Sequence, residues 1–413
     1  MSEAEDAELS AARWLLTAEA VRERSADLFA RIEEGRSDSF AFVPEAMAGI
    51  AGRVAALTRQ RFPALSVPLH ARWRHFETGG HDRFGALADA RGWTCREEAA
   101  RAMGDLAIVS VLLDAGAGAQ WRYREAVTGE TAARSEGLAL ASLAMFASGA
   151  FSSVPTDPLR ADAEALEGLT EDEFASGFQI APDNPLPGAE GRRALLANLA
   201  RAIRAAPDLF AVADDPRPGG IVDALAEEAE DGTLPASAIL AALLEGLGPI
   251  WPGRLVLGGL PLGDAWRHPA LGNTSPGADI VPFHKLSLWL SLSLVEPLTV
   301  RGIEVTNLDG LPGLAEYRNG GLFVDGGALV PRQEPAAPLP VGHPLVVEWR
   351  AATVTLLDRV APMVRERLGA DEVSLPLASI LEGGTWLAGR QLARELRPSG
   401  GPPIAIESDG TVF

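Results

Sequence analysis

Two glutamates in the C-terminal part of the sequence stand among aromatic and cationic residues, where a carboxylate could do acid–base or electrostatic work. Glu382, in ILEGGTWLAGRQLA, shares one face of an expected helix with Trp386, Gly389 and Arg390, because positions i, i+4 and i+7 to i+8 coincide. That face combines an acid, an aromatic plate and a cation.

The second glutamate is Glu348, in VVEWRAATV, which is flanked by Val347 and Trp349 and followed by Arg350. Each of these acids could simply be neutralised by a neighbouring arginine in a buried network. Several such acids in one stretch favour a shared pocket, and both interpretations stay open.

The string LAEYRNGG holds a third acid in unusual company. Glu316, Tyr317, Arg318 and Asn319 are consecutive, and the chain has only two tyrosines. The residues could form a solvated turn, since Asn-Gly-Gly is a turn signal, or they could line a polar pocket. Short apolar pieces in GLFVDGGALV predict a small hairpin over residues 303–330.

Basic residues gather in two places that could bind an anion. ARWRHFETGGHDR contains Arg72, Arg74, His75 and Arg83, and VPFHKLS contains His284 and Lys285. A phosphate needs charged donors from several directions, which arginine and lysine supply. The alternatives are a surface turn for the first string and a snorkelling lysine at a helix start for the second. Because Lys285 lies in an otherwise apolar segment, it is the preferred anion ligand.

Several common kinds of site are excluded by spacing. His70, His75 and His81 cluster without the HExxH or His/Cys pattern of a zinc site, so no metal is expected. The glycine-rich strings at 114 and 382 lack the Lys-Ser/Thr of a P-loop, and no GxSxG is present. Cys95 is the only cysteine, which excludes an intramolecular disulfide. No cofactor is predicted.

Composition limits the partners. The 413 residues carry a formal net charge of −20, which repels nucleic acid and anionic membranes at long range. The acidic, amphipathic start of the chain has no signal-peptide pattern, and the apolar stretches are too short to span a bilayer. We therefore expect a cytoplasmic protein that binds neither nucleic acid nor membrane. The oligomeric state cannot be predicted.

Helical periodicity dominates the chain, so the expected fold is mainly α with a small β element. Residues 1–150 form an expected N-terminal helical lobe. Residues 151–413 form a C-terminal helical lobe that carries most of the site, and the two lobes are expected to pack as one domain. The leucines of KLSLWLSLSLVEP alternate as in a strand, but the uninterrupted length between Pro282 and Pro297 favours a buried helix.

Many of these strings occur together in one known family. ARWRHFETGG, IVSVLLDAGAG, RSEGLA, DNPLPGAEGR, VPFHKLSLWL, GLAEYRNGGLFVDGG, VVEWRAATV, LEGGTW and the terminal SDGTVF resemble the uracil-catabolism protein family, from about residue 65 to the C-terminus. The resemblance implies a role in the further metabolism of ribosylurea, the ring-opened product of uracil that still carries ribose or ribose phosphate.

The order PFHK, AEYR, EWRA and LEGGTW is also similar, more distantly, to the queuosine-salvage nucleoside hydrolases, which have a DNA-glycosylase-like helical fold. That resemblance implies two acids at Glu316 and Glu382 and a phosphate-binding lysine at Lys285. Both acids are glutamate where that family has aspartate, which leaves each role open.

The predicted function is therefore hydrolysis of the N-ribosidic bond of ribosylurea or its 5′-phosphate. A non-catalytic binding or accessory subunit and a phosphoribosyltransferase are the alternatives. Glu316 is expected at the anomeric or ribose-hydroxyl side and Glu382 at the attacking water, and these two roles could be exchanged. The expected binding residues are Lys285 and His75 for phosphate, with Arg318, Asn319, Arg350, Glu348, Trp386, Trp349, Arg74 and His284.

Overall fold

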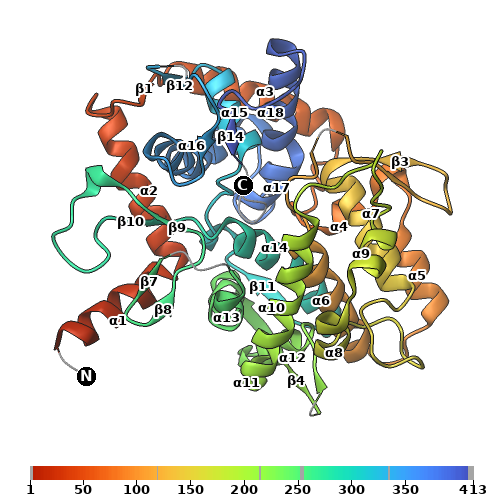
Figure 1. Ribbon diagram of the computed structural model, residues 1–413. Helices are drawn as coiled ribbons and strands as arrows, with labels where there is room; N and C mark the ends of the chain where they lie inside the picture. Colours follow the sequence, from red (N-terminus) through yellow and green to blue (C-terminus); the bar gives the residue numbers. More distant parts are fainter. Residues whose placement is uncertain (1–2, 119, 214, 252–254, 334, 408–413) are drawn as a thin grey trace.

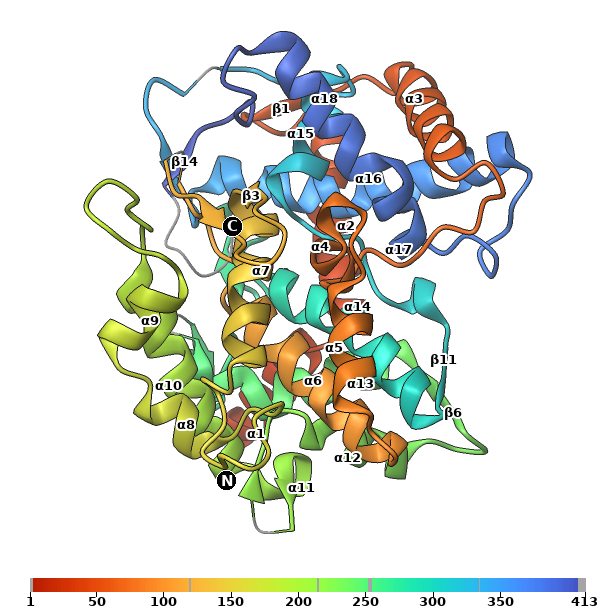
Figure 2. The same ribbon diagram turned by 90° about the vertical axis from the view of Figure 1, so that its right-hand side faces the viewer.

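The computed structural model describes residues 3–118, 120–213, 215–251, 255–333 and 335–407, and it is mainly α, as the periodicity predicts (Figures 1 and 2). The terminal SDGTVF string, residues 408–413, lies outside the described residues. The longer helices are α1 (Glu3–Leu15), α2 (Ala18–Glu33), α3 (Ala46–Arg61), α5 (Arg83–Arg91), α6 (Arg96–Leu112), α7 (Arg134–Ala147), α10 (Ala189–Ala205), α12 (Gly220–Glu228), α13 (Ala236–Leu247), α14 (Lys285–Arg301), α15 (Tyr317–Asp325), α16 (Pro344–Leu368) and α18 (Trp386–Leu396).

Short helical segments connect these elements. They are α4 (Trp73–Phe76), α8 (Ala163–Gly168), α9 (Glu171–Gly177), α11 (Pro207–Phe210) and α17 (Leu377–Ile380), with η1 (Thr78–Gly80), η2 (Gly248–Ile250), η3 (Pro269–Leu271), η4 (Leu308–Gly310) and the π-helical η5 (Leu381–Thr385). No helix among the described residues is long and apolar enough to cross a membrane.

The strands of the described residues have two or three residues each and pair only two by two. Antiparallel pairs join β1 (Phe40–Phe42) to β12 (Leu329–Pro331), β9 (Ala265–Arg267) to β10 (Ile280–Pro282), β2 (Tyr123–Arg124) to β3 (Thr131–Ala132), β4 (Ala211–Val212) to β5 (Asp215–Pro216), and β7 (Val256–Leu257) to β8 (Leu260–Pro261). Parallel pairs join β6 (Thr233–Pro235) to β11 (Glu304–Thr306) and β13 (Leu339–Pro340) to β14 (Ile406–Glu407).

The hairpin predicted over residues 303–330 is wrong. Tyr317–Asp325 forms helix α15, and Leu329–Pro331 pairs with Phe40–Phe42, far away in the sequence. The Asn-Gly-Gly string therefore lies inside a helix and not in a turn. Gly320 lets α16 pack close, because an added Cβ would lie only 2.7 Å from Trp349 Nε1, and the Glu316 side chain caps the helix start.

The ambiguous leucine-rich segment is the helix α14, as its length predicts. It runs through the middle of the molecule and packs against α6, α12 and α13 (Figures 1 and 2). Leu286 to Val295 are all buried, so the helix has no polar face. Its sequence therefore shows no helical repeat of polar and apolar residues. Two of the interleaved serines bond their hydroxyls to the helix itself: Ser291 donates to Ser287 O and Ser293 to Trp289 O, each at 2.9 Å.

Segments far apart in sequence pack together in the core, which consists of one large and two smaller hydrophobic clusters among the described residues. Helix α2 packs along α16, and α3 packs against both α16 and η5. In Figure 1, α2 accordingly lies beside α16, and α3 lies beside α16 and α18. The division of the chain at residue 150 stays a prediction, as does the likeness to DNA glycosylases.

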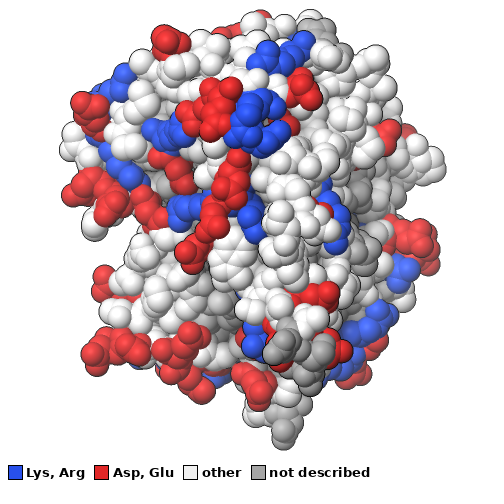
Figure 3. All heavy atoms as spheres, turned by 90° about the vertical axis from the view of Figure 1, so that its left-hand side faces the viewer, with Lys and Arg blue, Asp and Glu red and all other residues white. Residues whose placement is uncertain are grey.

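The face of the molecule in Figure 3 carries arginine and acidic side chains next to one another, with acids predominating at its lower edge. Two of the surface ion pairs of the chain are Arg53 with Glu395 and Arg359 with Glu33, at 2.9 and 2.6 Å. The face shown in Figure 3 has no broad basic patch, which agrees with the net charge of −20.

Candidate active site

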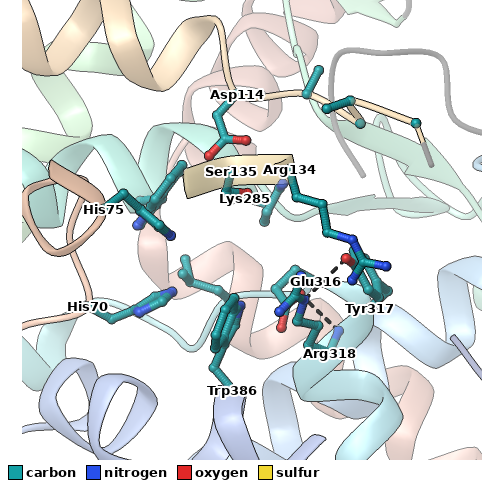
Figure 4. Close-up of a pocket in the computed structure, with 16 residues that line it drawn as sticks. His70, His75, Asp114, Arg134, Ser135, Lys285, Glu316, Tyr317, Arg318 and Trp386 are labelled. Carbon is teal, nitrogen blue, oxygen red and sulfur yellow. Dashed lines mark hydrogen bonds between the residues drawn. The ribbon is translucent and has the colours of Figure 1, made fainter. Parts of the chain in front are cut away.

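A cavity of about 310 Å³ lies where the N-termini of α7, α14 and α15 meet the start of α18 (Figure 4). The loop that follows α6 and the segment leading into α4 complete its walls. Its lining residues are His70, His75, Asp114, Ala115, Gly116, Ala117, Gly118, Arg134, Ser135, Lys285, Trp289, Leu314, Glu316, Tyr317, Arg318 and Trp386.

Glu316 faces this cavity from the N-cap of α15. Its carboxylate accepts hydrogen bonds from the backbone N–H groups of Arg318, at 2.8 Å, and Asn319. Each oxygen keeps a second lone pair for a ligand. The helix dipole favours a negative charge at this end. The capping interaction therefore holds an anionic carboxylate at the cavity wall.

Glu382, the second predicted acid, does not line the cavity. It lies in η5, where its Oε1 pairs with Arg61 Nη2 and its Oε2 with His70 Nδ1, both at 2.9 Å. Burial opposes its negative charge, but the His70 and Arg61 contacts outweigh burial and hold the pKa of Glu382 at about 2. Glu382 and Glu316 are not brought together as two acids that face one substrate.

His70 takes the position at the cavity that was expected for Glu382. Because Nδ1 contacts the Glu382 carboxylate, the other ring nitrogen, Nε2, is left for a ligand in the cavity toward which the ring points in Figure 4. The ring is flanked by Trp289 and Trp386, with centroids 6.2 and 6.1 Å away. In the sequence His70 is recognisable only as a potential metal ligand, because its carboxylate partner lies 312 positions away.

Lys285 and His75, the expected phosphate ligands, both line the cavity. Within the described part of the chain, the Lys285 ammonium has no hydrogen-bond or ion-pair partner. Burial lowers the pKa of Lys285, and the Glu316 carboxylate opposes this effect. Burial, reinforced by the Arg72 guanidinium, lowers the pKa of His75 to about 3, so its imidazole is neutral at physiological pH.

Arg318 and Trp386 form one wall together. The Arg318 guanidinium lies over the Trp386 ring, 4.0 Å from its centroid, and its Nε donates to Tyr317 Oη at 3.1 Å. Its Nη1 is buried and finds no acceptor among the described residues. A buried donor of this kind is costly unless a ligand satisfies it. Arg318 is thus a strong candidate to bind an anionic or carbonyl oxygen.

Asp114 is a cavity residue that the sequence analysis missed. It follows α6, and its carboxylate accepts from Arg72 Nη1 at 2.6 Å. The string DAGAG was considered only as a phosphate loop, whereas its Asp114 and small residues form the wall opposite Glu316 and Arg318 (Figure 4). Arg134 and Ser135, from the string RSEGLA, contribute the adjoining surface.

Three predicted site residues on α16 lie behind the cavity. Arg350 pairs through both Nη atoms with Asp264, at 2.7 Å each. Glu348 accepts from the Ser37 hydroxyl. Trp349 is 1% exposed. All three are buried in the packing of α16 and are not among the lining residues.

The remaining predicted residues are also outside the lining. Asn319 accepts from Thr385 Oγ1 at 2.9 Å and ties α15 to η5. Arg74 pairs with Glu296 at 2.7 Å. His284 contacts Leu15 O through Nε2 at 2.8 Å. These three residues join elements around the cavity.

No cluster of three or more His, Cys, Asp or Glu side chains suited to a metal ion occurs among the residues that the structure describes. The chemistry available in the cavity is that of carboxylates, a histidine with a carboxylate partner, an amine and arginines.

The fold and the cavity thus define a mainly helical protein with a polar pocket of small-molecule size. The chain belongs to the family described as "Protein of unknown function (DUF1688)", whose model matches residues 14–413. It is 38% identical to Protein urg3 of Schizosaccharomyces pombe over 411 residues, which cover 97% of this chain and 98% of that protein. It is 39% identical to Uracil catabolism protein 4 of Lachancea kluyveri over 380 residues, 84% and 85% of the two chains. The resemblance to the uracil-catabolism family is confirmed.

Proposed function

We propose that this protein acts in uracil catabolism by hydrolysing the N-ribosidic bond of ribosylurea or of its 5′-phosphate. The observation that carries the proposal is the arrangement of Glu316 and the His70–Glu382 pair around one cavity. The name of the Lachancea relative supports the pathway.

The cavity suits a small, polar substrate. Its volume of about 310 Å³ lies at the lower end of the range for small-molecule sites, roughly 300 to 1,000 Å³. Trp289 and Trp386 supply apolar walls, and carboxylates and cations supply the polar contacts. Ribosylurea offers hydroxyls, amide groups and, when phosphorylated, a dianion to match them.

Cleavage of a C–N bond at an anomeric carbon places positive charge on the sugar. The carboxylates of Glu316 and Asp114 line the cavity on opposite sides, where they would stabilise this charge. His70 would accept a proton from the attacking water through Nε2, because Glu382 binds its Nδ1. General acid–base catalysis contributes about 10²- to 10⁴-fold, so electrostatics and positioning supply the rest.

In this mechanism Glu382 is a positioning residue and does not itself activate the water. The 5′-phosphate would lie near Arg318 and Arg134, whose side chains border one end of the cavity in Figure 4. Neutral His75 would donate a hydrogen bond and carry no charge.

The test is to incubate purified protein with ribosylurea and, separately, with its 5′-phosphate, and to assay free urea without added pyrophosphate. Glu316→Gln and His70→Asn should each lower urea release by at least about 100-fold while the protein stays folded. Glu33→Gln, which changes a surface acid paired with Arg359, should leave it unchanged.

Three results would contradict the proposal. Absence of urea from both substrates, with tight binding of either, would identify a binding subunit. A strict requirement for pyrophosphate would identify a transferase. Wild-type rates in both variants would place the chemistry elsewhere.

A further inference from the structure

Lys285 is the only lysine in this chain, whereas the other 35 basic residues counted with it are arginine. Arginine therefore serves wherever else this sequence places a permanently charged basic side chain, including buried pairs such as Arg350 with Asp264. Arginine also binds phosphate or carboxylate better, because its planar guanidinium can donate two parallel hydrogen bonds. What lysine offers and arginine lacks is an amine that can lose its proton and act as a nucleophile.

The position of this lysine is fixed by buried groups. Lys285 is the first residue of α14, and its backbone N–H donates to Asp264 Oδ2 at 3.1 Å. Asp264 is itself held by both Nη atoms of Arg350 at 2.7 Å. The preceding residue, His284, has a left-handed backbone with φ of 46° and is tied to Leu15 O. This anchoring aims the side chain into the cavity, between Asp114 and Glu316 (Figure 4).

The surroundings favour a neutral amine. The ammonium finds no partner within the described residues, it lies at the positive end of a helix, and burial lowers its pKa. The Glu316, Asp114 and Asp264 carboxylates oppose that shift, and Glu316 lines the same cavity, where it can accept a proton from the amine. Arg318 and Arg134 line the same cavity, so an anion can still be bound when Lys285 is uncharged.

We propose that Lys285 is the covalent catalytic residue of the cavity and forms an imine with C1 of the sugar. This proposal builds on the hydrolase activity proposed above. The amine lone pair forms a bond to C1 while the bond from C1 to the urea nitrogen breaks. The amine gives up one proton and the departing nitrogen gains one, so urea leaves neutral.

The sugar then leaves by ordinary imine hydrolysis. The ring C1–O bond of the lysyl glycosylamine opens, the ring oxygen takes a proton, and an imine forms between Lys285 and C1. The attacking water, from which His70 accepts a proton, adds to C1 of this imine, the amine departs, and the sugar is released as its aldehyde. The sum is hydrolysis, with no oxidant or reductant, and His70 and Glu316 line the cavity in which the protons move.

The direct test traps the imine in wild-type protein. Incubation with ribose 5-phosphate and sodium cyanoborohydride should give one stable side-chain adduct, because Lys285 is the only side-chain primary amine. Trypsin normally cleaves after Lys285 and would give residues 268–285 and 286–301. The adduct blocks this cleavage and should give a single modified peptide of residues 268–301. An adduct confined to the N-terminal amine would overturn the proposal, and this test needs no variant.

Two variants distinguish covalent catalysis by the Lys285 amine from binding of an anion by its positive charge. Lys285→Arg keeps the charge but should lower urea release by at least about 100-fold. Lys285→Cys, made with Cys95→Ser to remove the exposed cysteine, should regain at least about 10-fold after alkylation with 2-bromoethylamine, which rebuilds an amine of similar length. If the Lys285→Arg protein released urea at a rate near that of wild type, Lys285 would be an anion ligand and not a nucleophile.

The outcomes also separate the two proposals. Urea release by wild type without any Lys285 adduct and with an active Lys285→Arg variant would overturn the imine and leave the hydrolase intact. A Lys285 adduct in a protein that releases no urea would support the amine chemistry and overturn the hydrolase.

Discussion

Glu382 reaches the cavity only through His70, whose Nδ1 lies 2.9 Å from the Glu382 Oε2. A carboxylate in this position fixes the tautomer and orientation of the imidazole, so that Nε2 can accept a proton. The arrangement makes one functional unit from two residues that are 312 positions apart.

The variant Glu382→Gln should lower kcat by at least about 100-fold with little change in KM, because an amide can donate to Nδ1 and favour the wrong tautomer. The measurement is the pH profile of kcat, whose acidic limb should change in the variant. Glu395→Gln, which removes a surface acid paired with Arg53 at 2.9 Å, is the control and should behave as wild type. Unchanged kcat in Glu382→Gln would contradict the functional pairing.

Asp264→Asn should destabilise the protein by about 3 to 5 kcal/mol at pH 7, because it leaves the Arg350 guanidinium buried without its counter-ion. Urea denaturation would measure this loss. Asp279→Asn, in the neighbouring pair with the exposed Arg267, should cost no more than about 1 kcal/mol. Equal losses in the two variants would contradict a special role for the buried pair.

The Asp264 pair also predicts a pH dependence. Burial raises the pKa of Asp264, but Arg350 outweighs burial and holds it well below the ordinary value. A carboxylate whose pKa is lower in the folded protein than in the unfolded chain stabilises the folded state at pH values above its unfolded-state pKa, about 3.9. This stabilisation is lost as the pH falls through the folded-state pKa. The free-energy difference between wild type and Asp264→Asn should therefore be constant from pH 5 to 8 and narrow below about pH 4. A difference in unfolding free energy between the two proteins that increases on acidification would contradict this.

Arg318→Lys should not be conservative. Lysine would lose the stacking on Trp386 at 4.0 Å and the hydrogen bond to Tyr317 Oη, each worth about 0.5 to 1.5 kcal/mol. KM for the 5′-phosphate of ribosylurea should rise by about 10-fold. The matched change Arg24→Lys, at an arginine stacked on Trp14, should leave KM unaltered. An unchanged KM in Arg318→Lys would remove Arg318 from the binding site.

Gly389→Ala should destabilise the protein by about 1 to 3 kcal/mol, because the added methyl group would collide with the carbonyl oxygen of Arg318 and push α18 away from α15. Thermal unfolding would report the loss. Gly49→Ala lies in the open on α3 and should instead stabilise by roughly 0.5 to 1 kcal/mol. A stabilised Gly389→Ala protein would contradict the close packing of these helices.

Local sequence signals predicted the helices well where length and flanking residues were decisive. The leucine-rich segment is a helix because it is long and uninterrupted. LAEYRNGG was misread because the turn signal of Asn-Gly-Gly competes with a helix cap, and the close packing against α16 and α18 that favours the helix is tertiary.

The site could be predicted only in part, for a similar reason. Glu316, Lys285, His75, Arg318 and Trp386 line the cavity, since each lies at or near the end of a helix that opens onto it. His70 carries no local sign of its carboxylate partner, and the lining role of Asp114 depends on how α6 ends against other elements. Long-range pairings of this kind leave no mark in a single sequence.

The positions of the cavity residues in the sequence determine when the cavity can form during translation. His70 and Trp386 share a wall, so a nascent chain exposes the first long before the ribosome has made the second. At about 5 to 20 residues per second, the 312 positions between His70 and Glu382 take roughly 15 to 60 seconds to translate. During that interval the early cavity residues lack their final partners, and the binding pocket can be completed only when synthesis is nearly finished.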